Sequence, residues 1–485
     1  MTKLRKTLLS IFVAIIAFVA IMAFLLRGDA AQQTLAETSG PKPVLVDPDA
    51  QTIPTVGTAD PIGWQAGEAP VAAQGLTVTR FADGLEHPRT ILTLPNGDVL
   101  AAETNGPASG ASGITGMVEK YLMKKVGAGG VSPNKLVLLR DANGDGVAEQ
   151  RFVLSNPALH SPFGMAWRDG RLYVANTDAV LSFPYALGDT TLSGTPEKLM
   201  DLPGAGRHWA RNLLLNPEGT LLYVTIGSGT DHAENGIEQE KGRAAIFEYD
   251  FAKKRSREYA AGLRNPNGLD WNPNSGELWT TVNERDMLGS DLVPDYLTNV
   301  PSGVQYGWPW VYWKNHLDDR VSAPIPEFFT EYTRKPEYGL GAHVAALGLA
   351  FSRGGNVMGP RFASGAFIAR HGSWNRRPLS GYDVVFVGFD HLGNALPAPP
   401  VPVLTGFLTK DGAAHGRPTW VGFARDGALL VSDDVGGVIW RVVAPGAVPA
   451  PSIVPTKSDR APVQPKLHGT IAAPAPDSDL LKGQQ

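Results

Sequence analysis

Residues 268–282 read GLDWNPNSGELWTTV and contain the repeating unit that decides the fold. A first apolar run ends at Trp271, an Asn-Ser-Gly turn follows, and a second run leads from Glu277 to Val282. A glycine-containing turn between two runs of strand length is the pattern of a β-hairpin. The stretch therefore predicts two neighbouring antiparallel strands with polar residues at both ends of the pair.

The same pattern recurs five more times, with polar insertions between the copies. A hairpin cannot bury its own apolar face, so repeated hairpins must pack against one another. Six sheets arranged radially form a β-propeller, and a β-sandwich is less favoured because its strands would recur more densely. We therefore predict an all-β, six-bladed propeller, whose fifth copy begins at Phe362. The turns of the other five copies lie at Asn96-Gly97, Asp169-Gly170, Glu218-Gly219, Ser364-Gly365 and Asp426-Gly427.

The composition suits a chain of many short strands. The 485 residues include 55 glycines and 39 prolines, and only 19% are charged. Turns rather than long helices follow from such a composition. The net charge of −4 contains no basic block, which argues against a nucleic-acid partner. Cysteine is absent, which excludes disulfides, thiolate metal sites and a cysteine nucleophile.

The N-terminus predicts export. A basic start, MTKLRK, precedes an apolar run from Leu8 to Leu26 that is long enough to span a bilayer core as a helix. The basic end stays in the cytoplasm, so the rest of the chain faces the periplasm from the inner membrane. Cleavage near Gly28-Asp29-Ala30 is the alternative, and it would give a secreted or periplasmic protein. Residues 1–30 are therefore a signal anchor, with a transmembrane helix, or a signal peptide.

The segments on either side of the hairpins have the composition of flexible chain. Residues 31–75 are rich in Ala, Pro, Gly and Thr, and residues 444–485 in Pro and Ala. Such segments bury too little apolar surface to offset the entropy of ordering. We expect a flexible linker, a propeller over residues 76–443, and a disordered tail. The strand-like runs Leu76 to Arg80 and Val438 to Val442 are predicted to pair in one blade and close the ring.

An acidic turn follows the first hairpin. Asp141, Asn143, Asp145 and Glu149 place oxygen-bearing side chains around a glycine turn, which suits a hard cation such as calcium. The turn begins like an EF-hand loop, but its twelfth position is Phe152 rather than glutamate. We expect a structural calcium ion there, with a solvated turn as the alternative.

Polar residues recur just before the first strand of successive hairpins. A propeller brings equivalent points of its blades to one rim, where ligands bind. A histidine at such a point is a candidate general base, because its ordinary pKa allows it to accept a proton near neutral pH. The residues at this point are His160, His208, Arg264 with Asn265, His343 and Arg417.

Several segments together resemble the glucose/sorbosone dehydrogenase family, and in particular its sorbosone dehydrogenase branch. The resemblance covers about residues 76–443, and the order and spacing of its motifs make it specific. Members of that family are six-bladed propellers that use pyrroloquinoline quinone (PQQ) with calcium. The motifs are LRNPNGL at 263–269, NERD at 283–286, YGWP at 306–309, HVAALG at 343–348, RHGSWNR at 370–376 and the stretch 416–434.

The resemblance implies roles for individual residues. His208 would be the base that removes the substrate's hydroxyl proton. Asp231 would orient its imidazole, because Ser228 stands where soluble family members carry an aspartate. Backbone carbonyls of Glu284-Arg285-Asp286, which lacks the Gly-Pro pair of those members, would hold the cofactor calcium, a Lewis acid for the quinone. The cofactor contacts that the resemblance implies are His160, Arg264, Asn265, His343, His371, Arg376 and Arg417.

The implied function is oxidation of an aldose or a sorbosone-like sugar aldehyde, with electrons passed to a membrane quinone or cytochrome. PQQ would carry the redox chemistry, while the protein supplies orientation, a base and charge. Two alternatives stay open, because a fold does not determine a function. One is a calcium-dependent lactonase whose metal is held by Asp231, Glu284 and Asp286, and the other is a non-enzymatic scaffold. The rim arginines favour the dehydrogenase, since a neutral lactone gives no reason for several buried guanidinium groups.

Overall fold

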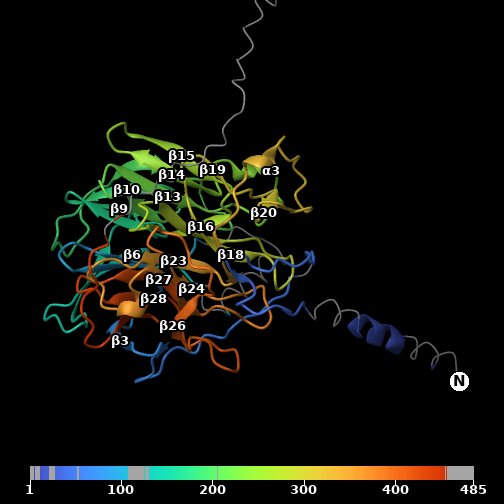
Figure 1. The fold of residues 1–485 in the computed structure, drawn as a ribbon, viewed down its shortest axis with the longest axis horizontal. Coiled ribbons are helices and arrows are strands. Elements are labelled where there is room, and N and C mark those ends of the chain that lie inside the picture. Colours follow the sequence, from blue (N-terminus) through green and yellow to red (C-terminus); the bar gives the residue numbers. More distant parts are fainter. Residues whose placement is uncertain are drawn as a thin grey trace, which may run out of the picture.

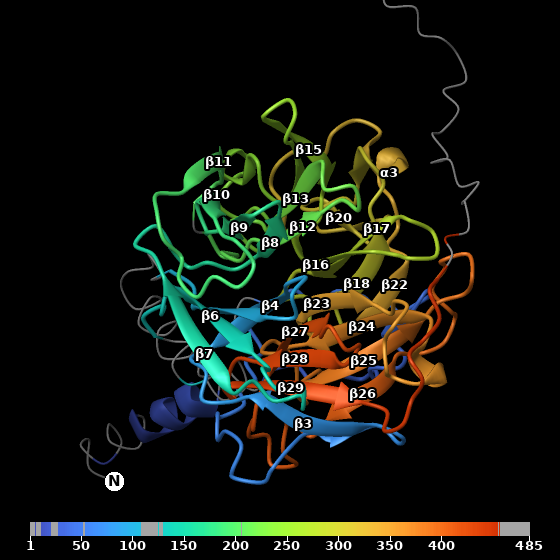
Figure 2. The ribbon, with the colours of Figure 1, turned by 90° about the vertical axis from the view of Figure 1, so that its left-hand side faces the viewer.

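The computed structural model describes residues 5, 11–20, 28–51, 54–107, 125, 130–204, 206–453 and 455. Six antiparallel sheets surround a common axis, and Figure 2 shows their innermost strands gathered near the middle of the ring. The prediction of an all-β, six-bladed propeller is confirmed.

Each blade has four main strands, and in the first five blades the chain runs from the innermost strand outward. The innermost strands are β4 (Pro88–Thr93), β8 (Met165–Arg168), β12 (Leu213–Leu215), β16 (Asn265–Trp271), β23 (Ala346–Phe351) and β27 (Pro418–Phe423). The second strands are β5 (Val99–Glu103), β9 (Arg171–Ala175), β13 (Leu221–Ile226), β17 (Leu278–Asn283), β24 (Gly365–Arg370) and β28 (Leu429–Asp433). The third strands are β6 (Lys135–Arg140), β10 (Ala179–Pro184), β14 (Ala245–Asp250), β18 (Pro294–Asn299), β25 (Asp383–Gly388) and β29 (Val438–Val443). The outermost strands are β7 (Gln150–Ser155), β11 (Glu197–Asp201), β15 (Arg255–Ala261), β22 (Tyr338–Ala342), β26 (Val401–Thr405) and β3 (Thr77–Ala82).

Short elements extend three of the blades. β1 (Ser39–Gly40) pairs with β22, β2 (Val71–Ala72) pairs with β26, and β19 (Val304–Gln305) runs parallel to β15. The chain between β19 and β22 carries the β20–β21 hairpin (Val311–Tyr312 and His316–Leu317) and the helix α3 (Phe329–Tyr332), at the upper right of Figure 1. This insertion reaches the functional rim described below.

The first and last strands of the propeller close the ring, as predicted. β3 pairs antiparallel with β29, in a register that runs from Thr77 opposite Val443 to Ala82 opposite Ile439. Pairing satisfies two sheet edges that would otherwise be open to another chain. Neighbouring blades pack through apolar side chains; for example, Leu100 of β5 and Val174 of β9 belong to one buried cluster.

The fifth blade begins earlier than predicted. Its innermost strand is β23, whereas Phe362 lies in the short 3-10 helix Pro360–Phe362. The hairpin pattern missed β23 because residues 352–364 join it to β24 by a connection longer than a tight turn. A glycine at 348 lets this strand approach blade six, since a Cβ there would lie 2.6 Å from the Cα of Trp420.

The predicted flexible linker is instead packed against the propeller in its described residues. The amides of Ala31 and Gln32 donate to the carbonyl of Arg377 (2.7 Å) and to the carboxylate of Asp291 (2.6 Å). Hydrogen bonds of this kind order a segment that has little apolar surface of its own, which composition alone does not reveal. In the tail, the amide of Ala450 donates to the carbonyl of Asn356 (2.9 Å), and most of residues 444–485 lie outside the described residues.

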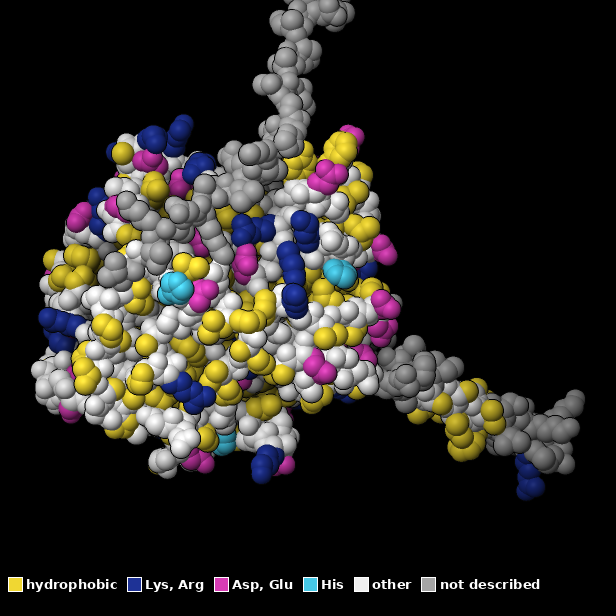
Figure 3. Space-filling view, in the orientation of Figure 1, with side chains coloured by type: hydrophobic (Ala, Val, Ile, Leu, Met, Phe, Trp, Pro, Cys, Tyr) yellow, Lys and Arg dark blue, Asp and Glu magenta, His cyan; other side chains and the backbone are white. Residues whose placement is uncertain are grey.

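Most of the apolar N-terminal run also lies outside the described residues. Residues 11–20 form a helix whose apolar side chains are exposed and stand clear of the propeller (Figure 3). Within the described part of the chain, no helix combines the length and the apolar character needed to cross a membrane. Figure 3 also shows lysine and arginine at several places on this side of the molecule, with one group near its centre.

Candidate functional site

One face of the propeller collects the starts of the innermost strands and the ends of the second strands. This follows from the antiparallel pairing of β12 with β13, β16 with β17 and β27 with β28. The N-terminal segment lies on the same face, because the amides of Asp49 and Gln51 donate to the carbonyls of Leu288 and Met287. The loops at this face form the rim that holds the candidate site.

His208 has one ring nitrogen fixed and the other without a partner among the residues that the structure describes. Its Nδ1 atom lies 2.9 Å from the carbonyl oxygen of Ser228 and 3.0 Å from the hydroxyl oxygen of the same residue. A carbonyl only accepts hydrogen bonds, so the proton of the neutral ring resides on Nδ1. Burial, followed by the nearby Arg264 and Arg207, lowers the pKa of His208 well below its usual range. The Nε2 atom therefore has a lone pair that can accept a proton.

A glycine brings this histidine close to Asn265. A Cβ at Gly227 would lie 2.6 Å from the Cβ of His208 and 2.3 Å from Oδ1 of Asn265, so no larger residue fits there. The Nδ2 atom of Asn265 donates to Asn283, whereas its buried Oδ1 has no hydrogen-bond partner among the described residues. A buried amide oxygen without a partner requires an explanation, and at the rim a ligand could supply the missing donor.

Arg264 is buried and its guanidinium group is fully engaged by the protein. Nη2 lies 2.6 Å from Oδ1 of Asp231 and 3.1 Å from Oδ2 of Asp286, and Nε donates to the carbonyl of Asp231 at 3.1 Å. Nη1 donates to the carbonyls of Glu284 (2.5 Å) and Asn283 (3.4 Å). Arg264 therefore organises the carboxylates beneath His208, and these contacts use all five of its N–H groups.

Asp231 faces Arg264 and not the imidazole of His208. Its Oδ1 atom also accepts the amide of Asp286 at 2.9 Å, and its Oδ2 lies 3.3 Å from Nδ1 of His232. Although burial acts in the opposite direction, Arg264 and the hydrogen bond from His232 hold the pKa of Asp231 well below its usual range. The orienting contact predicted for Asp231 is made instead by Ser228.

The Glu284-Arg285-Asp286 turn is held by cations on every side. The Oε2 atom of Glu284 lies 3.0 Å from Nε of Arg285, whose buried side chain also contacts Asp318 and the carbonyls of Pro309 and Val311. The carboxylate of Asp286 meets Arg264 and, at 3.0 Å, Nη2 of Arg207. This turn lies in the site, and its carboxylates are already paired.

A second charged cluster lies on the other side of the rim. Nε2 of His371 lies 3.0 Å from both carboxylate oxygens of Asp434, which also pairs with Arg89. Burial, followed by Arg417, lowers the pKa of His371 to about 4. Arg417 donates from Nε and Nη2 to the carbonyls of His371 and Gly372, both at 2.9 Å. Its Nη1 has no protein partner among the described residues, and the same is true of the buried Nε of Arg89.

Aromatic residues connect the two clusters around the rim. The guanidinium carbon of Arg89 lies 5.8 Å from the ring centre of Trp209, the neighbour of His208. Arg207 precedes His208 in the sequence, and its guanidinium carbon lies 5.7 Å from the ring centre of Trp374, a residue of the His371 loop. His208 is thus flanked by residues that reach both ends of the second cluster, so the two clusters line one site.

Three of the predicted cofactor contacts have other surroundings than predicted. The His160 side chain is 64% exposed, and its Nδ1 lies 4.0 Å from Oδ2 of Asp178. His343 is buried, and it contacts Asp286 (3.5 Å) and the carbonyl of Gly289 (3.0 Å). Arg376 binds Asp291 at 2.7 Å and the carbonyl of Gln33 at 2.7 Å, so it holds the N-terminal segment.

Several residues of the site were not predicted from the sequence. Arg89 could have been, since it lies at the start of β4 as Arg264 and Arg417 lie just before their own strands. Asp434 directly follows β28 and carried no separate signal. The others are Arg207, Ser228, Trp374, Asp318 and Arg320.

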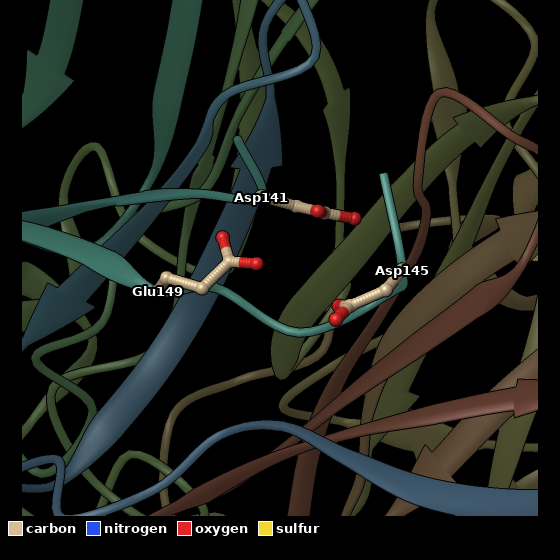
Figure 4. Close-up of side chains that lie close together, drawn as sticks. All are labelled: Asp141, Asp145 and Glu149. Carbon is tan, nitrogen blue, oxygen red and sulfur yellow. The ribbon is translucent and has the colours of Figure 1, made fainter. Parts of the chain in front are cut away.

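The acidic turn between β6 and β7 brings its carboxylates together, as Figure 4 shows. Asp141, Asp145 and Glu149 each offer an oxygen, and these oxygens all lie within 4.8 Å of one another. Asn143 lies beside them, with Nδ2 3.1 Å from Oδ2 of Asp145. Such a set of oxygens can hold a hard cation, and it lies on the outer edge of a blade, away from the rim.

Two relatives match more than half of the chain. An uncharacterized protein of Borreliella burgdorferi is 29% identical over 295 residues, which cover 59% of this chain and 76% of that protein. A pyrroloquinoline quinone-dependent pyranose dehydrogenase of Coprinopsis cinerea is 25% identical over 430 residues, which cover 76% of this chain. The chain spans only about half of that dehydrogenase, since the match covers 54% of its length.

Solved structures share the fold. The calcium structure of the Trichoderma reesei carbohydrate-active enzyme of family AA12 has a TM-score of 0.63 at 20% identity, and the match covers 77% of this chain and 96% of that one. The holo form of the PQQ domain of the Coprinopsis cinerea pyranose dehydrogenase has a TM-score of 0.59 at 20% identity, and the match covers 80% of this chain and 100% of that one. At this identity, the likeness shows the fold alone.

The family follows from a match over most of the chain. The model of a family described as TrAA12-like matches residues 70–302 and 327–444, which span all six blades. The relationship to PQQ-dependent sugar dehydrogenases that the sequence motifs predicted is thereby confirmed. The chain belongs to the TrAA12-like family.

Proposed function

We propose that this chain is a PQQ-dependent dehydrogenase that oxidises a sugar at the rim of the propeller. The observation that carries the proposal is His208, a neutral imidazole with Nδ1 fixed by Ser228 and Nε2 without a protein partner among the described residues. The family relationship and the PQQ-dependent pyranose dehydrogenase among the relatives support the same activity.

The rim contains polar atoms that have no hydrogen-bond partner within the described part of the chain and could bind a planar anion such as PQQ, which carries three carboxylates. Among the described residues, Nη1 of Arg417 has no protein partner, and Nε of Arg89 and Oδ1 of Asn265 are buried without one. Guanidinium groups suit carboxylates because their N–H groups match the geometry of the two oxygens. Arg417, Arg89 and Asn265 are therefore the residues that would hold the cofactor.

When bound, PQQ supplies an electrophilic quinone that accepts two electrons as hydride. The protein supplies the base: Nε2 of His208 accepts the hydroxyl proton, while Nδ1 keeps its own proton and donates it in a hydrogen bond to the carbonyl of Ser228. Arg264 and Arg207 disfavour the resulting imidazolium, so the proton leaves readily and the base is regenerated. Asp286 partly offsets this repulsion.

The finer parts of the proposal concern substrate, acceptor and location. We propose an aldose or a sorbosone-like sugar aldehyde as the substrate and a membrane quinone or cytochrome as the electron acceptor. The apolar run Leu8 to Leu26 supports an exported protein, anchored in the inner membrane and facing the periplasm. The acidic turn at 141–149 is proposed to hold a structural calcium ion.

The lactonase alternative is weakened by the pairing of its proposed ligands. Asp231 and Asp286 both face Arg264, and Glu284 faces Arg285, so none of the three offers a free carboxylate. Within the described part of the chain, the only cluster of metal-ligating side chains is that of the acidic turn.

The experiment that tests the proposal is reconstitution of the purified chain with PQQ, followed by a dye-linked assay over a panel of aldoses and sugar aldehydes. We expect turnover that depends on added PQQ and is lost in His208→Ala. Absence of PQQ binding in an absorbance titration would contradict the proposal.

A further inference from the structure

Two of the three turn carbonyls expected to hold a cofactor calcium, those of Glu284 and Asp286, each accept a hydrogen bond from an arginine. Nη1 of Arg264 lies 2.5 Å from the carbonyl oxygen of Glu284. Nη1 of Arg320 lies 2.9 Å from the carbonyl oxygen of Asp286 and 3.5 Å from that of Met287. A calcium ion needs six to eight oxygen ligands and would have to displace these contacts or lie beside two guanidinium groups.

Arg320 is held in this position by a buried carboxylate. Its Nε and Nη2 atoms lie 2.8 and 2.7 Å from the two oxygens of Asp318. Asp318 also receives Nη1 of Arg285 at 3.3 Å, which fixes it from the opposite side. Moving Arg320 away from the turn would break a bidentate ion pair and leave Asp318 with a single partner.

The acidic side chains of the turn are paired with arginines without a metal ion. Four carboxylates and four guanidinium groups form one connected network of contacts between 2.6 and 3.8 Å. The carboxylates are Asp231, Glu284, Asp286 and Asp318, and the guanidinium groups are Arg207, Arg264, Arg285 and Arg320. A dication added here would have to compete with these guanidinium groups for the carboxylates.

The segment that supplies Arg320 lies outside the family match. The family model covers residues up to 302 and resumes at 327, whereas Asp318 and Arg320 lie between these limits. Trp308, from the same segment, donates its Nε1 to the carbonyl of Asp231 at 3.0 Å. The insertion therefore contacts the site through Trp308 and through Arg320, and Arg320 places a positive charge beside the turn.

We propose that Arg320, together with Arg264, takes the place of a cofactor calcium at the Glu284–Asp286 turn, so that this chain binds PQQ without a divalent cation. Arg320 is a positioning residue: it holds the turn carbonyls and supplies positive charge beside the cofactor site. The inference rests on the proposed function for its cofactor, but its statement about calcium can be tested separately.

The first test needs no cofactor. Equilibrium dialysis with radioactive calcium is applied to the full chain carrying Asp145→Asn and Glu149→Gln, which disable the acidic turn. We expect no bound calcium at millimolar concentration, and about one equivalent after Arg320→Ala is added. Calcium bound at the turn of the chain that retains Arg320 would overturn the proposal, whether or not PQQ binds.

The second test measures PQQ affinity by absorbance titration in EGTA and in calcium. For the parent chain we expect the same affinity in both. Arg320→Ala should lose about tenfold or more in EGTA and recover in calcium, and Arg320→Lys should lose less, since a cation remains. Arg255→Ala, which removes an exposed arginine of β15, is the matched control and should behave like the parent.

The results separate the two proposals. PQQ binding by the parent only in calcium would overturn the role of Arg320 and leave the dehydrogenase proposal intact. Failure to bind PQQ in either buffer would overturn the dehydrogenase proposal, while the dialysis result would still decide the question of calcium. If Arg320→Ala melts far below the parent, the proposal is tested by the titrations of Arg320→Lys and of the parent in EGTA and in calcium.

Discussion

The Nδ1 atom of His208 lies 2.9 Å from the main-chain oxygen of Ser228, so a carbonyl rather than a carboxylate orients the candidate base. A carbonyl fixes the tautomer as well as a carboxylate does, but it does not stabilise the imidazolium by a full negative charge. The two nearby charges that act most strongly on the ring, Arg264 and Arg207, are positive. The base is therefore built to stay neutral and to give up a captured proton easily.

Replacing the base should separate catalysis from binding. His208→Ala is expected to lower sugar oxidation by about a hundred- to ten-thousand-fold, the usual contribution of a positioned general base. PQQ affinity should change little, because the arginines and Asn265 remain. His232→Ala is the control, since its ring faces Asp231 and Glu234 rather than Ser228. Loss of turnover in His232→Ala but not in His208→Ala would contradict the assignment.

The acid limb of the pH–rate profile should lie below the ordinary histidine pKa of about 6.5. The base works only when neutral, and burial with Arg264 and Arg207 lowers its pKa, so activity persists as the pH falls past 6.5. Arg207→Gln removes one of these cations and should move the limb to higher pH. The measurement is kcat/KM against pH for both chains, and a limb that moves to lower pH in Arg207→Gln would contradict the electrostatic reason.

The fold and part of the site could be predicted because their signals are local. A glycine turn between apolar runs defines a hairpin within about fifteen residues, and the position before a strand points to a rim. His208 and Arg417 were found in this way. Arg320 could not be found, because it reaches the carbonyl of Asp286 across 34 positions of sequence from an insertion without strand pattern.

The orienting partner of the base was missed for another reason. Ser228 contacts the ring through its main-chain carbonyl, which every residue possesses, as well as through its hydroxyl, so its identity signalled only part of the contact. Asp231 was predicted instead because an aspartate is the expected partner, but the structure pairs it with Arg264. The identity of a side chain can predict a contact made by that side chain, but not a contact made by the main chain of the same residue.

Arg417 and Arg264 should respond differently to removal, although both were predicted to bind the cofactor. Arg417→Ala should lower PQQ affinity by about ten- to a hundredfold, the effect of about 1.5–3 kcal/mol for one charge-assisted hydrogen bond. Arg264→Ala should mainly destabilise the fold, by about 3–5 kcal/mol, because it leaves Asp231 and Asp286 buried without their main partner. Absorbance titration and thermal melting distinguish the two effects, and equal losses of stability in both variants would contradict this division.

Calcium should stabilise the acidic turn between β6 and β7. At a calcium concentration a hundred times its Kd, the gain is about 2.7 kcal/mol, and EGTA should remove it. Asp145→Asn should abolish this calcium dependence, because it removes a charged oxygen from the cluster. Asp411→Asn, in another Asp-Gly turn, is the control. Thermal melting in calcium and in EGTA checks the prediction, and a melting temperature that does not respond to calcium in the parent would contradict it.

The closure of the ring should control the stability of the whole propeller. Deleting residues 76–81 removes most of β3, so β29 becomes an open edge and the side chains of Ile439 and Trp440, both fully buried, lose their cover. Exposing a large apolar side chain costs about 1.5–3 kcal/mol, so the deletion should lower the free energy of unfolding by several kcal/mol. Chemical denaturation monitored by tryptophan fluorescence measures the effect. Deleting residues 456–485, for which the sequence predicts no packed structure, is the control. Because the six blades support one another around a closed ring, we expect the chain without residues 76–81 to unfold in one cooperative transition at a lower denaturant concentration than the parent. If this shortened chain unfolded at the parental midpoint, the stability of the ring would not depend on the pairing of β3 with β29.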